Sequence, residues 1–265
     1  MGTVGDNQLA ALSGYTGTIQ DRIRKALYNA PDDTGTIDDL GGYLGRTSFW
    51  SSPADESNLV GWYQPSGLVG TPSITQWDDD SGEGNHLTVV TGTNPQATGS
   101  INSVTCARFS ATNSIGCVVS YSQPMTVHIV AKSAFTTNTR YLFSAHSPYA
   151  TDRRFGASST GNWEVSFGAT LGFAYARNTV PNIFSVVIDG ATSKVYEDGV
   201  LLASGNVGTA GFQAFTLGGV LNTFQCFDGD VAEAVMLNKA ADAASLNRVG
   251  EYLGGLYGVT WNAVS

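Results

Sequence analysis

The sequence has few charged residues and no long hydrophobic run. Only 13% of its 265 residues are charged, and the formal net charge is -9. Binding to DNA, RNA or anionic membranes depends on basic patches, so this acidic balance argues against nucleic acid as a partner. No apolar run approaches the ~20 residues that a membrane-spanning helix needs, so no membrane insertion is expected.

The N-terminus also lacks the features of a signal peptide. The first residues, MGTVGDNQLAALSGYTG, contain no basic start and no long apolar stretch.

Cysteine is scarce, and Cys106, Cys117 and Cys226 form an odd set without C-x-x-C spacing. This pattern favours buried free thiols, although a hairpin disulfide between Cys106 and Cys117 stays open. We expect a chain that is made and folds in a reducing cytoplasm.

Motifs of common catalytic sites are missing as well. His86, His128 and His146 are scattered without metal-binding spacing. The sequence contains no G-x-S-x-G elbow and no glycine loop that cradles phosphate. Glu164 stands alone among apolar residues, and Glu233 is the only acidic residue in an otherwise apolar run. These absences predict a protein that is not an enzyme.

Glycine and short apolar runs, by contrast, are abundant. The chain has 32 glycines and 42% hydrophobic residues. Turn residues recur every 8–12 positions between short runs, which is typical of an antiparallel β protein. We predict fifteen strands, at 58–63, 73–77, 86–91, 104–110, 115–121, 125–132, 140–145, 153–158, 162–168, 171–177, 182–189, 193–198, 200–204, 212–218 and 230–237.

The C-terminal part predicts a buried strand followed by one helix. The run from Val231 to Leu237 is apolar except for Glu233, which is typical of a strand covered on both faces. A helical pattern then opens at Asp242 and closes at Gly258. Its apolar positions are Leu246, Val249, Leu253 and Tyr257.

The residues F-D-G-D-V-A-E at 227–233, with the helix behind them, resemble the end of concanavalin A-like, laminin-G-like jelly-roll domains. Further matches are L-V-G-W-Y at 59–63, W-D-D-D-S-G-E-G-N-H-L at 77–87, C-A-R-F at 106–109, M-T-V-H-I-V-A at 125–131 and V-Y-E-D-G-V at 195–200. The resemblance implies a mainly β fold, namely a two-sheet antiparallel jelly-roll sandwich over residues 58–265. This fold carries lectins, hydrolases, adhesion modules and virion proteins.

Residues 1–48 differ from the rest and predict short helices. G-T-I-Q-D at 17–21 recurs as G-T-I-D-D at 35–39, and Pro31 ends the first helical pattern. This repeated sequence resembles short helical modules of tailed-phage structural proteins. This resemblance implies an anchoring segment at 1–48, joined by a polar linker at 49–57, that binds other virion proteins. It also implies a homo-oligomer, with a trimer favoured, located in the virion.

Three functions follow as hypotheses. The first is a non-enzymatic structural component of a bacteriophage virion, such as a head decoration, fibre or tail appendage, whose sandwich binds host-surface glycans. The second is a free carbohydrate-binding lectin or adhesin. The third is a glycoside hydrolase, which is disfavoured because the strand motif E-x-D-x-x-E of the β-glucan-cutting enzymes of this fold is missing.

Two candidate sites are proposed from residue type. Tyr149, Trp163, Tyr175 and Arg177 could line a sugar-binding surface, and the alternative is ordinary sheet packing. Asp78, Asp79, Asp80 and Asn85 form the densest set of oxygen ligands and could hold calcium, the one cofactor considered. The alternative is that their side chains cap turns of an irregular loop.

Overall fold

The computed structural model describes residues 50–265 except 135–139, 146–152, 159–161, 176–177 and 220–224. The chain divides into two units, Met1–Ser51 and Ser52–Ser265. The second unit is described below. The helices predicted within residues 1–48 lie outside the described residues. Their anchoring role therefore stays a prediction.

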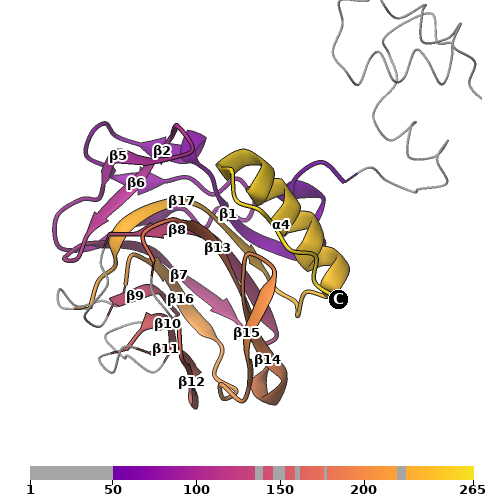
Figure 1. The fold of residues 1–265 in the computed structure, drawn as a ribbon. Helices are drawn as coiled ribbons and strands as arrows, with labels where there is room; N and C mark the ends of the chain where they lie inside the picture. The colour runs from indigo at the N-terminus through magenta and orange to yellow at the C-terminus, as the bar shows by residue number, and fades with distance from the viewer. Residues whose placement is uncertain (1–49, 135–139, 146–152, 159–161, 176–177, 220–224) are drawn as a thin grey trace, which may run out of the picture. The chain divides into compact units, whose positions relative to one another are not determined.

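Two antiparallel sheets form the sandwich (Figure 1). The eight-stranded sheet has the order β15-β14-β13-β8-β17-β6-β5, and β1 also pairs with β17. Its strands are β15 (Val200–Gly205), β14 (Ser193–Glu197), β13 (Pro181–Ile188), β8 (Met125–Ser133), β17 (Asp228–Leu237), β6 (Val104–Ser110), β5 (Gln96–Ile101) and β1 (Leu59–Tyr63).

The nine-stranded sheet has the order β12-β11-β10-β9-β16-β7-β4-β3-β2. Its strands are β12 (Thr170–Phe173), β11 (Trp163–Phe167), β10 (Arg153–Ala157), β9 (Arg140–Ser144), β16 (Phe212–Leu217), β7 (Ser114–Tyr121), β4 (Leu87–Thr91), β3 (Gln76–Trp77) and β2 (Leu68–Val69). The prediction of a mainly β, two-sheet antiparallel sandwich is therefore confirmed.

Strand β17 lies at the centre of the eight-stranded sheet. One of its edges pairs with β8, while the other edge is shared between β6 and β1. Residues Gly229–Leu237 are all buried. This burial on both faces explains the apolar run that the sequence shows, because such a strand has no solvent-exposed side.

The main core lies between the sheets and is rich in aromatic side chains. In β11 the alternate residues Trp163, Val165 and Phe167 point into it and are at most 2% exposed. Trp163 stacks on Phe184 of β13, with ring centroids 4.8 Å apart and an interplanar angle of 20°. The alternation predicted for β11 is confirmed. The contact between Trp163 and Phe184 links the two sheets.

A second apolar layer lies between the eight-stranded sheet and α4 (Ala243–Tyr257). The Asp242 side chain accepts the Ser245 N–H at 2.8 Å, and Gly258 closes the helix in the left-handed conformation with φ 67°. Leu246, Val249, Leu253 and Tyr257 are at most 3% exposed. The predicted helix and its inward stripe are confirmed, and no helix of the described residues is long and apolar enough to cross a membrane.

Residues 52–57 differ from the predicted linker. They contain η1 (Pro53–Asp55), and the Glu56 side chain is buried. Its carboxylate accepts hydrogen bonds from Lys239 Nζ, the Ser245 hydroxyl and Arg248 Nε, each at 2.7 Å. These residues belong to the sandwich, so any link is shorter than the predicted 49–57.

The sequence analysis did not predict two of the strands, β2 and β5. Its prediction of free cysteine thiols is confirmed. Strand β2 is only two residues long, and β5, which reads Q-A-T-G-S-I, lacks an apolar pattern. All three cysteines are free thiols, so no disulfide joins Cys106 to Cys117. Cys106 and Cys226 are buried, whereas Cys117 is half-buried.

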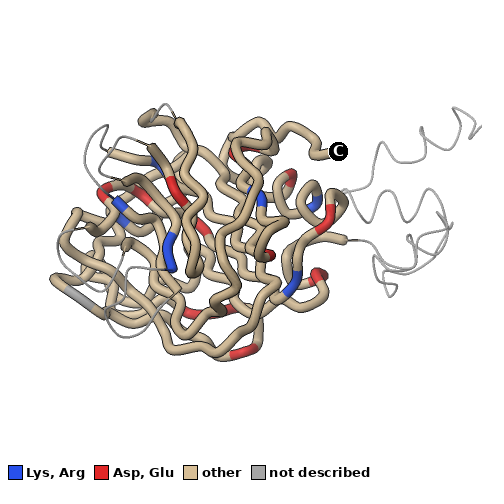
Figure 2. The backbone as a smooth tube through the Cα atoms, turned by 90° about the horizontal axis from the view of Figure 1, so that it is seen from below, with Lys and Arg blue, Asp and Glu red and all other residues tan. Residues whose placement is uncertain are grey.

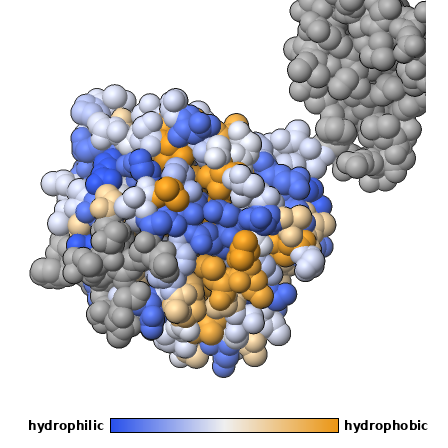
Figure 3. All heavy atoms as spheres, in the orientation of Figure 1, coloured by the Kyte–Doolittle hydropathy of each residue, from blue (hydrophilic) through white to orange (hydrophobic). Residues whose placement is uncertain are grey.

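Charged side chains are sparse along the described backbone, and most of the tube in Figure 2 carries neither sign. Apolar surface gathers over β15 in Figure 3, where Val200 is 52% and Leu201 50% exposed.

Candidate functional site

A row of small and polar residues crosses the outer face of the nine-stranded sheet. Directly paired residues of antiparallel strands point to the same face, so the row can be followed from strand to strand. It runs through Val69, Gln76, Thr88, Gly116, Thr216, Ser144, Arg154, Ser166 and Thr170. Neighbouring residues in the middle of these strands point to the core, as Trp77, Leu87, Phe155 and Val165 do. The described residues place no helix on this outer face, whereas α4 packs on the other sheet.

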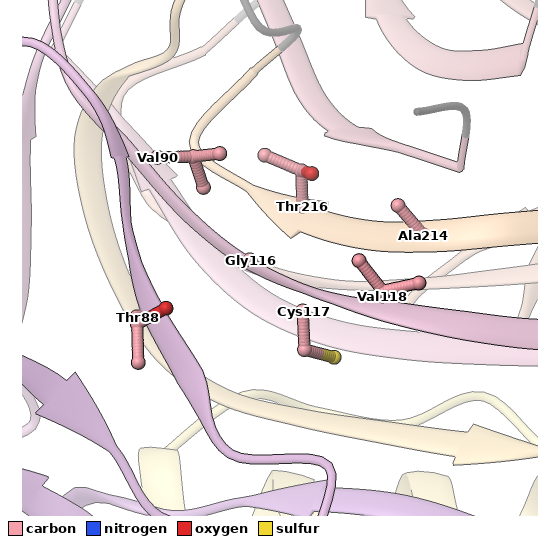
Figure 4. A pocket seen from close by; sticks show the side chains of 7 residues that line it. All are labelled: Thr88, Val90, Gly116, Cys117, Val118, Ala214 and Thr216. Atoms are coloured by element: carbon pink, nitrogen blue, oxygen red, sulfur yellow. The ribbon is translucent and has the colours of Figure 1, made fainter. Parts of the chain in front are cut away.

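The centre of this row is hollowed (Figure 4). We call this depression of about 200 Å³ the sheet hollow. It is lined by Thr88 and Val90 of β4, Gly116, Cys117 and Val118 of β7, and Ala214 and Thr216 of β16. Val118 is 79% and Val90 42% exposed, and Thr88 is exposed as well, so valine methyl groups and the Thr88 hydroxyl meet solvent in the same place, whereas Thr216 is 1% exposed.

Gly116 sets the shape of the sheet hollow. A Cβ atom at this position would lie 2.7 Å from Thr216 Oγ1 and 2.8 Å from the Phe215 carbonyl oxygen. Any side chain would therefore collide with the neighbouring strand. The glycine allows β7 and β16 to approach closely and keeps the floor of the hollow free of side-chain atoms.

A second depression lies further along the same two strands, where β7 ends and β16 begins. We call it the rim hollow; its volume is about 260 Å³. It is lined by Ser120, Tyr121, Ser122, Arg153, Thr209, Gly211, Phe212 and Gln213. Arg153 reaches it from β10, and its Nη1 donates to the Gly211 carbonyl oxygen at 2.8 Å.

The lining of the two hollows contains few side chains of the kinds that carry acid–base catalysis. Among the described residues that line them there is no carboxylate and no histidine. Burial raises the pKa of the Cys117 thiol to about 11, so the thiol is protonated at neutral pH. The described lining residues offer hydrogen-bond donors and acceptors, and apart from the Tyr121 hydroxyl, whose pKa burial raises, they include no carboxylate, imidazole or thiolate for acid–base or nucleophilic catalysis.

Glu164 lies on the same face but is already paired. Its Oε1 accepts hydrogen bonds from Arg154 Nε at 2.8 Å and from the Tyr141 hydroxyl at 3.0 Å. The Arg154 guanidinium also lies over the Tyr141 ring, 5.0 Å from its centroid. This neutralised cluster forms a rigid polar part of the face rather than a free acid.

The prediction that Trp163 lines a sugar-binding surface is wrong, and the same prediction for Tyr175 is not supported. Trp163 is only 2% exposed and points into the core, where it cannot touch a ligand. Tyr175 packs edge-on against it, with centroids 5.0 Å apart, and its hydroxyl donates to Glu197. Sheet packing, the alternative considered, explains both rings. Tyr149 and Arg177 lie outside the described residues.

The acidic loop at 78–85 is a network of turn contacts. Both oxygens of the buried Asp79 carboxylate accept protein donors. Oδ1 accepts the Trp62 N–H at 2.8 Å and the Ser81 N–H at 2.9 Å, and Oδ2 accepts the Ser81 hydroxyl at 2.8 Å and the Asn85 N–H at 2.9 Å. These contacts give Asp79 a structural role.

The other carboxylates of this loop turn to separate partners. Asp80 accepts from the Gln64 amide at 2.8 Å, and Asp78 lies beside Gln76 and His86. The Asn85 amide donates to the Val60 carbonyl at 2.8 Å. Within the described part of the chain, no three His, Cys, Asp or Glu side chains are grouped to hold a metal ion. The geometry thus favours turn capping over the predicted calcium site.

No family of known sequences matches the chain, and no curated protein matches it either. Solved structures do share its fold. Domain 4 of AbnA, a GH43 extracellular arabinanase from Geobacillus stearothermophilus solved with arabinotriose, matches with TM-score 0.56 and 16% identity. The match covers 77% of this chain and all of that domain.

Two longer enzymes contain a similar sandwich. Trypanosoma rangeli sialidase in complex with sialic acid matches with TM-score 0.55 and 12% identity, over 74% of this chain and 33% of the sialidase. A GH54 α-L-arabinofuranosidase matches with TM-score 0.56 and 14% identity, over 70% of this chain and 51% of that enzyme. At these identities the likeness establishes the β-sandwich fold alone.

Proposed function

We propose that the chain is a non-catalytic carbohydrate-binding domain that holds its ligand in the sheet hollow. The observation that carries this proposal is the open hollow on the outer face of the nine-stranded sheet, floored by Gly116 and lined by threonine hydroxyls and valine methyl groups. Sugar rings present the same mixture of hydroxyl groups and C–H surface. The hollow is therefore complementary to a sugar unit in both polarity and size.

The comparisons support this proposal without deciding it. The arabinanase domain was solved with arabinotriose and the sialidase with sialic acid, so sandwiches of this fold occur in proteins that meet sugars. The catalytic alternative is disfavoured because the described lining residues offer no carboxylate pair for glycoside cleavage. We therefore propose binding and not hydrolysis.

Affinity for a single sugar unit is expected to be low. The sheet hollow is shallow, and no aromatic ring is among its described lining residues. Shallow sites reach useful avidity when several copies act together. This fits the further proposal, carried only by the sequence of residues 1–48, that this segment anchors copies of the domain, as a trimer, in a tailed-phage virion.

Two matched substitutions test the proposed site. Val118→Glu places a charge in the sheet hollow at a side chain that is 79% exposed, so the fold should tolerate it. Val200→Glu makes the same change on β15 of the other sheet, at a side chain that is 52% exposed. Binding is measured on immobilised neutral and acidic polysaccharides. We expect wild type and Val200→Glu to bind alike, and Val118→Glu to bind about tenfold more weakly, a loss of about 1.4 kcal/mol.

Two outcomes would contradict the proposal. The first is a folded wild-type chain that binds no member of the polysaccharide panel. The second is equal binding by Val118→Glu and Val200→Glu, which would move the site away from the nine-stranded sheet. Release of reducing sugar by the wild type, above a boiled control, would overturn the non-catalytic part alone.

A further inference from the structure

Arg153 is a cation in the rim hollow, and among the described residues it has no acidic partner. Most described arginines that point into the protein meet a carboxylate: Arg108 meets Asp228, Arg154 meets Glu164 and Arg248 meets Glu56. Arg153 forms no ion pair with any residue that the structure describes. Its Nη1 donates to the Gly211 carbonyl oxygen, and its buried Nε has no hydrogen-bond partner.

The surroundings of Arg153 are suited to a ligand. The other described residues that line the rim hollow are uncharged, and Ser120, Ser122 and Thr209 supply hydroxyl groups. Because Gly211 fixes Nη1, the planar guanidinium is held in one orientation before any ligand arrives. A fixed guanidinium with free N–H groups is the arrangement that binds a carboxylate or sulfate through charge-assisted hydrogen bonds.

The rim hollow is also placed to extend the sheet hollow. Both are built on β7 and β16 and their ends: the first uses Gly116–Val118 with Ala214 and Thr216, and the second uses Ser120–Ser122 and Gly211–Gln213. Six residue steps separate Gly116 from Ser122, which is about 20 Å along a strand. That length exceeds one sugar ring, so a ligand that reaches both hollows is an oligosaccharide.

We infer that the rim hollow binds the acidic group of a sugar unit, so that the preferred ligand is an acidic oligosaccharide held along β7 and β16. The inference rests on the proposed function, since it assigns a ligand class to a ligand that extends from the sheet hollow to the rim of the same sheet. The shared chemistry is an anionic substituent, either a carboxylate or a sulfate. The net charge of -9 opposes general attraction of polyanions. Selectivity therefore depends on one local contact.

The experiment uses glycans in pairs that differ only in charge. The probes are galacturonate oligomers with their methyl esters, sialyllactose with lactose, and dextran sulfate with dextran. The full-length chain is compared with Arg153→Gln, Arg153→Lys and the control Lys194→Gln. Lys194 is an exposed residue of β14, so the control removes one positive charge from the other sheet. Melting curves verify that all variants are folded.

We expect the wild type to prefer the acidic member of at least one pair by about 10- to 100-fold. Arg153→Gln should abolish this preference while binding of the neutral member stays unchanged, and Lys194→Gln should retain it. Arg153→Lys should keep part of the preference, because the charge remains but the planar fork is lost. The probe pair that shows the preference tells whether the rim hollow binds a carboxylate or a sulfate.

Equal binding of acidic and neutral members by the wild type would overturn the inference and leave the proposed function intact. A preference that survives in Arg153→Gln would also overturn it. If no probe binds to any variant, both the inference and the proposed function are rejected. A preference lost equally in Arg153→Gln and Lys194→Gln would show a general charge effect and reject the assigned contact.

Discussion

At the scale of single residues, two buried carboxylates lie in the layer between the eight-stranded sheet and α4 and are stabilised in different ways. Glu56 is held by two cations, Lys239 and Arg248. Glu233 has only neutral donors, Trp62 Nε1 at 2.6 Å and the Tyr257 hydroxyl at 2.7 Å. Burial acts to raise the pKa of both groups. For Glu56 the hydrogen bonds from Lys239, Ser245 and Arg248 outweigh it and lower the pKa below 4.5, whereas the pKa of Glu233 stays raised.

Glu56→Ala should destabilise the domain by about 3 kcal/mol, because it leaves two cations beside a vacated buried site. Glu251→Ala, the same change at an exposed position of α4, should alter the free energy of unfolding by less than about 0.5 kcal/mol. Urea unfolding of both variants measures the difference. Equal stability of the two would mean that residues 52–57 do not belong to the folded unit.

Glu233→Gln should remove a pH dependence. A raised folded pKa means that the folded state binds the proton more tightly, so the contribution of Glu233 to stability falls as pH rises from 4.5 through its folded pKa. The unfolding free energy of wild type minus that of Glu233→Gln should therefore decrease between pH 4.5 and neutrality. Urea titrations across this range measure it, and a difference that grows with pH would contradict the assignment.

At the scale of elements, the C-terminal tail is fitted to α4 by glycines. A Cβ atom at Gly250 would lie 2.2 Å from Cε2 of the Trp261 ring, and one at Gly254 would lie 2.5 Å from the Val259 carbonyl oxygen. Asn247 then holds the tail through Trp261 Nε1 at 3.0 Å and the Val264 N–H at 2.7 Å. The tail and the helix thus form one unit on the eight-stranded sheet.

Gly250→Ala should lower the melting temperature, since the new methyl group displaces the Trp261 ring from the helix. Gly255→Ala is the matched control, because no atom lies within 4 Å of its added Cβ. In the last turn of α4 this control should gain less than about 1 kcal/mol, as alanine has the higher helix propensity. Opposite shifts of the two melting temperatures are expected. A rise in both would mean that the tail does not pack on α4.

The sequence predicts elements that carry their own local signals. Asp242 and Gly258 bound α4, and the turn at Asp198 and Gly199 has the positive φ values of 50° and 83° that an Asp-Gly hairpin requires. Strand β5 has no such signal; it pairs with β6, and a Cβ atom at its Gly99 would lie 2.8 Å from Asp230 Oδ1 of β17, a contact between distant residues. Local patterns cannot report a strand that depends on its partner.

The candidate site was missed for a related reason. Trp163 and Tyr175 are residue types that bind sugars, but alternation alone shows which residues share a face and not which face meets solvent. Val118 alternates with inward-facing residues of β7, yet only the pairing of β4, β7 and β16 shows that its face is open. The sequence could not single out Arg153, because the absence of an acidic partner among the described residues becomes visible only in the folded chain.

At the scale of the whole molecule, Ser52–Ser265 has its own core and should fold alone. Chains that start at residue 52 and at residue 58 should differ, because only the longer one keeps Glu56 with its partners on α4. We expect the 52–265 chain to unfold cooperatively, and the 58–265 chain to melt at a lower temperature. Calorimetry measures both. Loss of cooperative unfolding in 52–265 would show that residues 1–51 complete the core.

The most direct test of the central claim is an NMR titration of the isotope-labelled domain with the glycan that binds best. The account predicts that the largest amide shift changes fall on residues 116–122 of β7 and its end and 211–216 of β16, with small changes in α4. Shift changes confined to α4, or to the Arg108–Asp228 pair on the eight-stranded sheet, would contradict a binding site on the nine-stranded sheet.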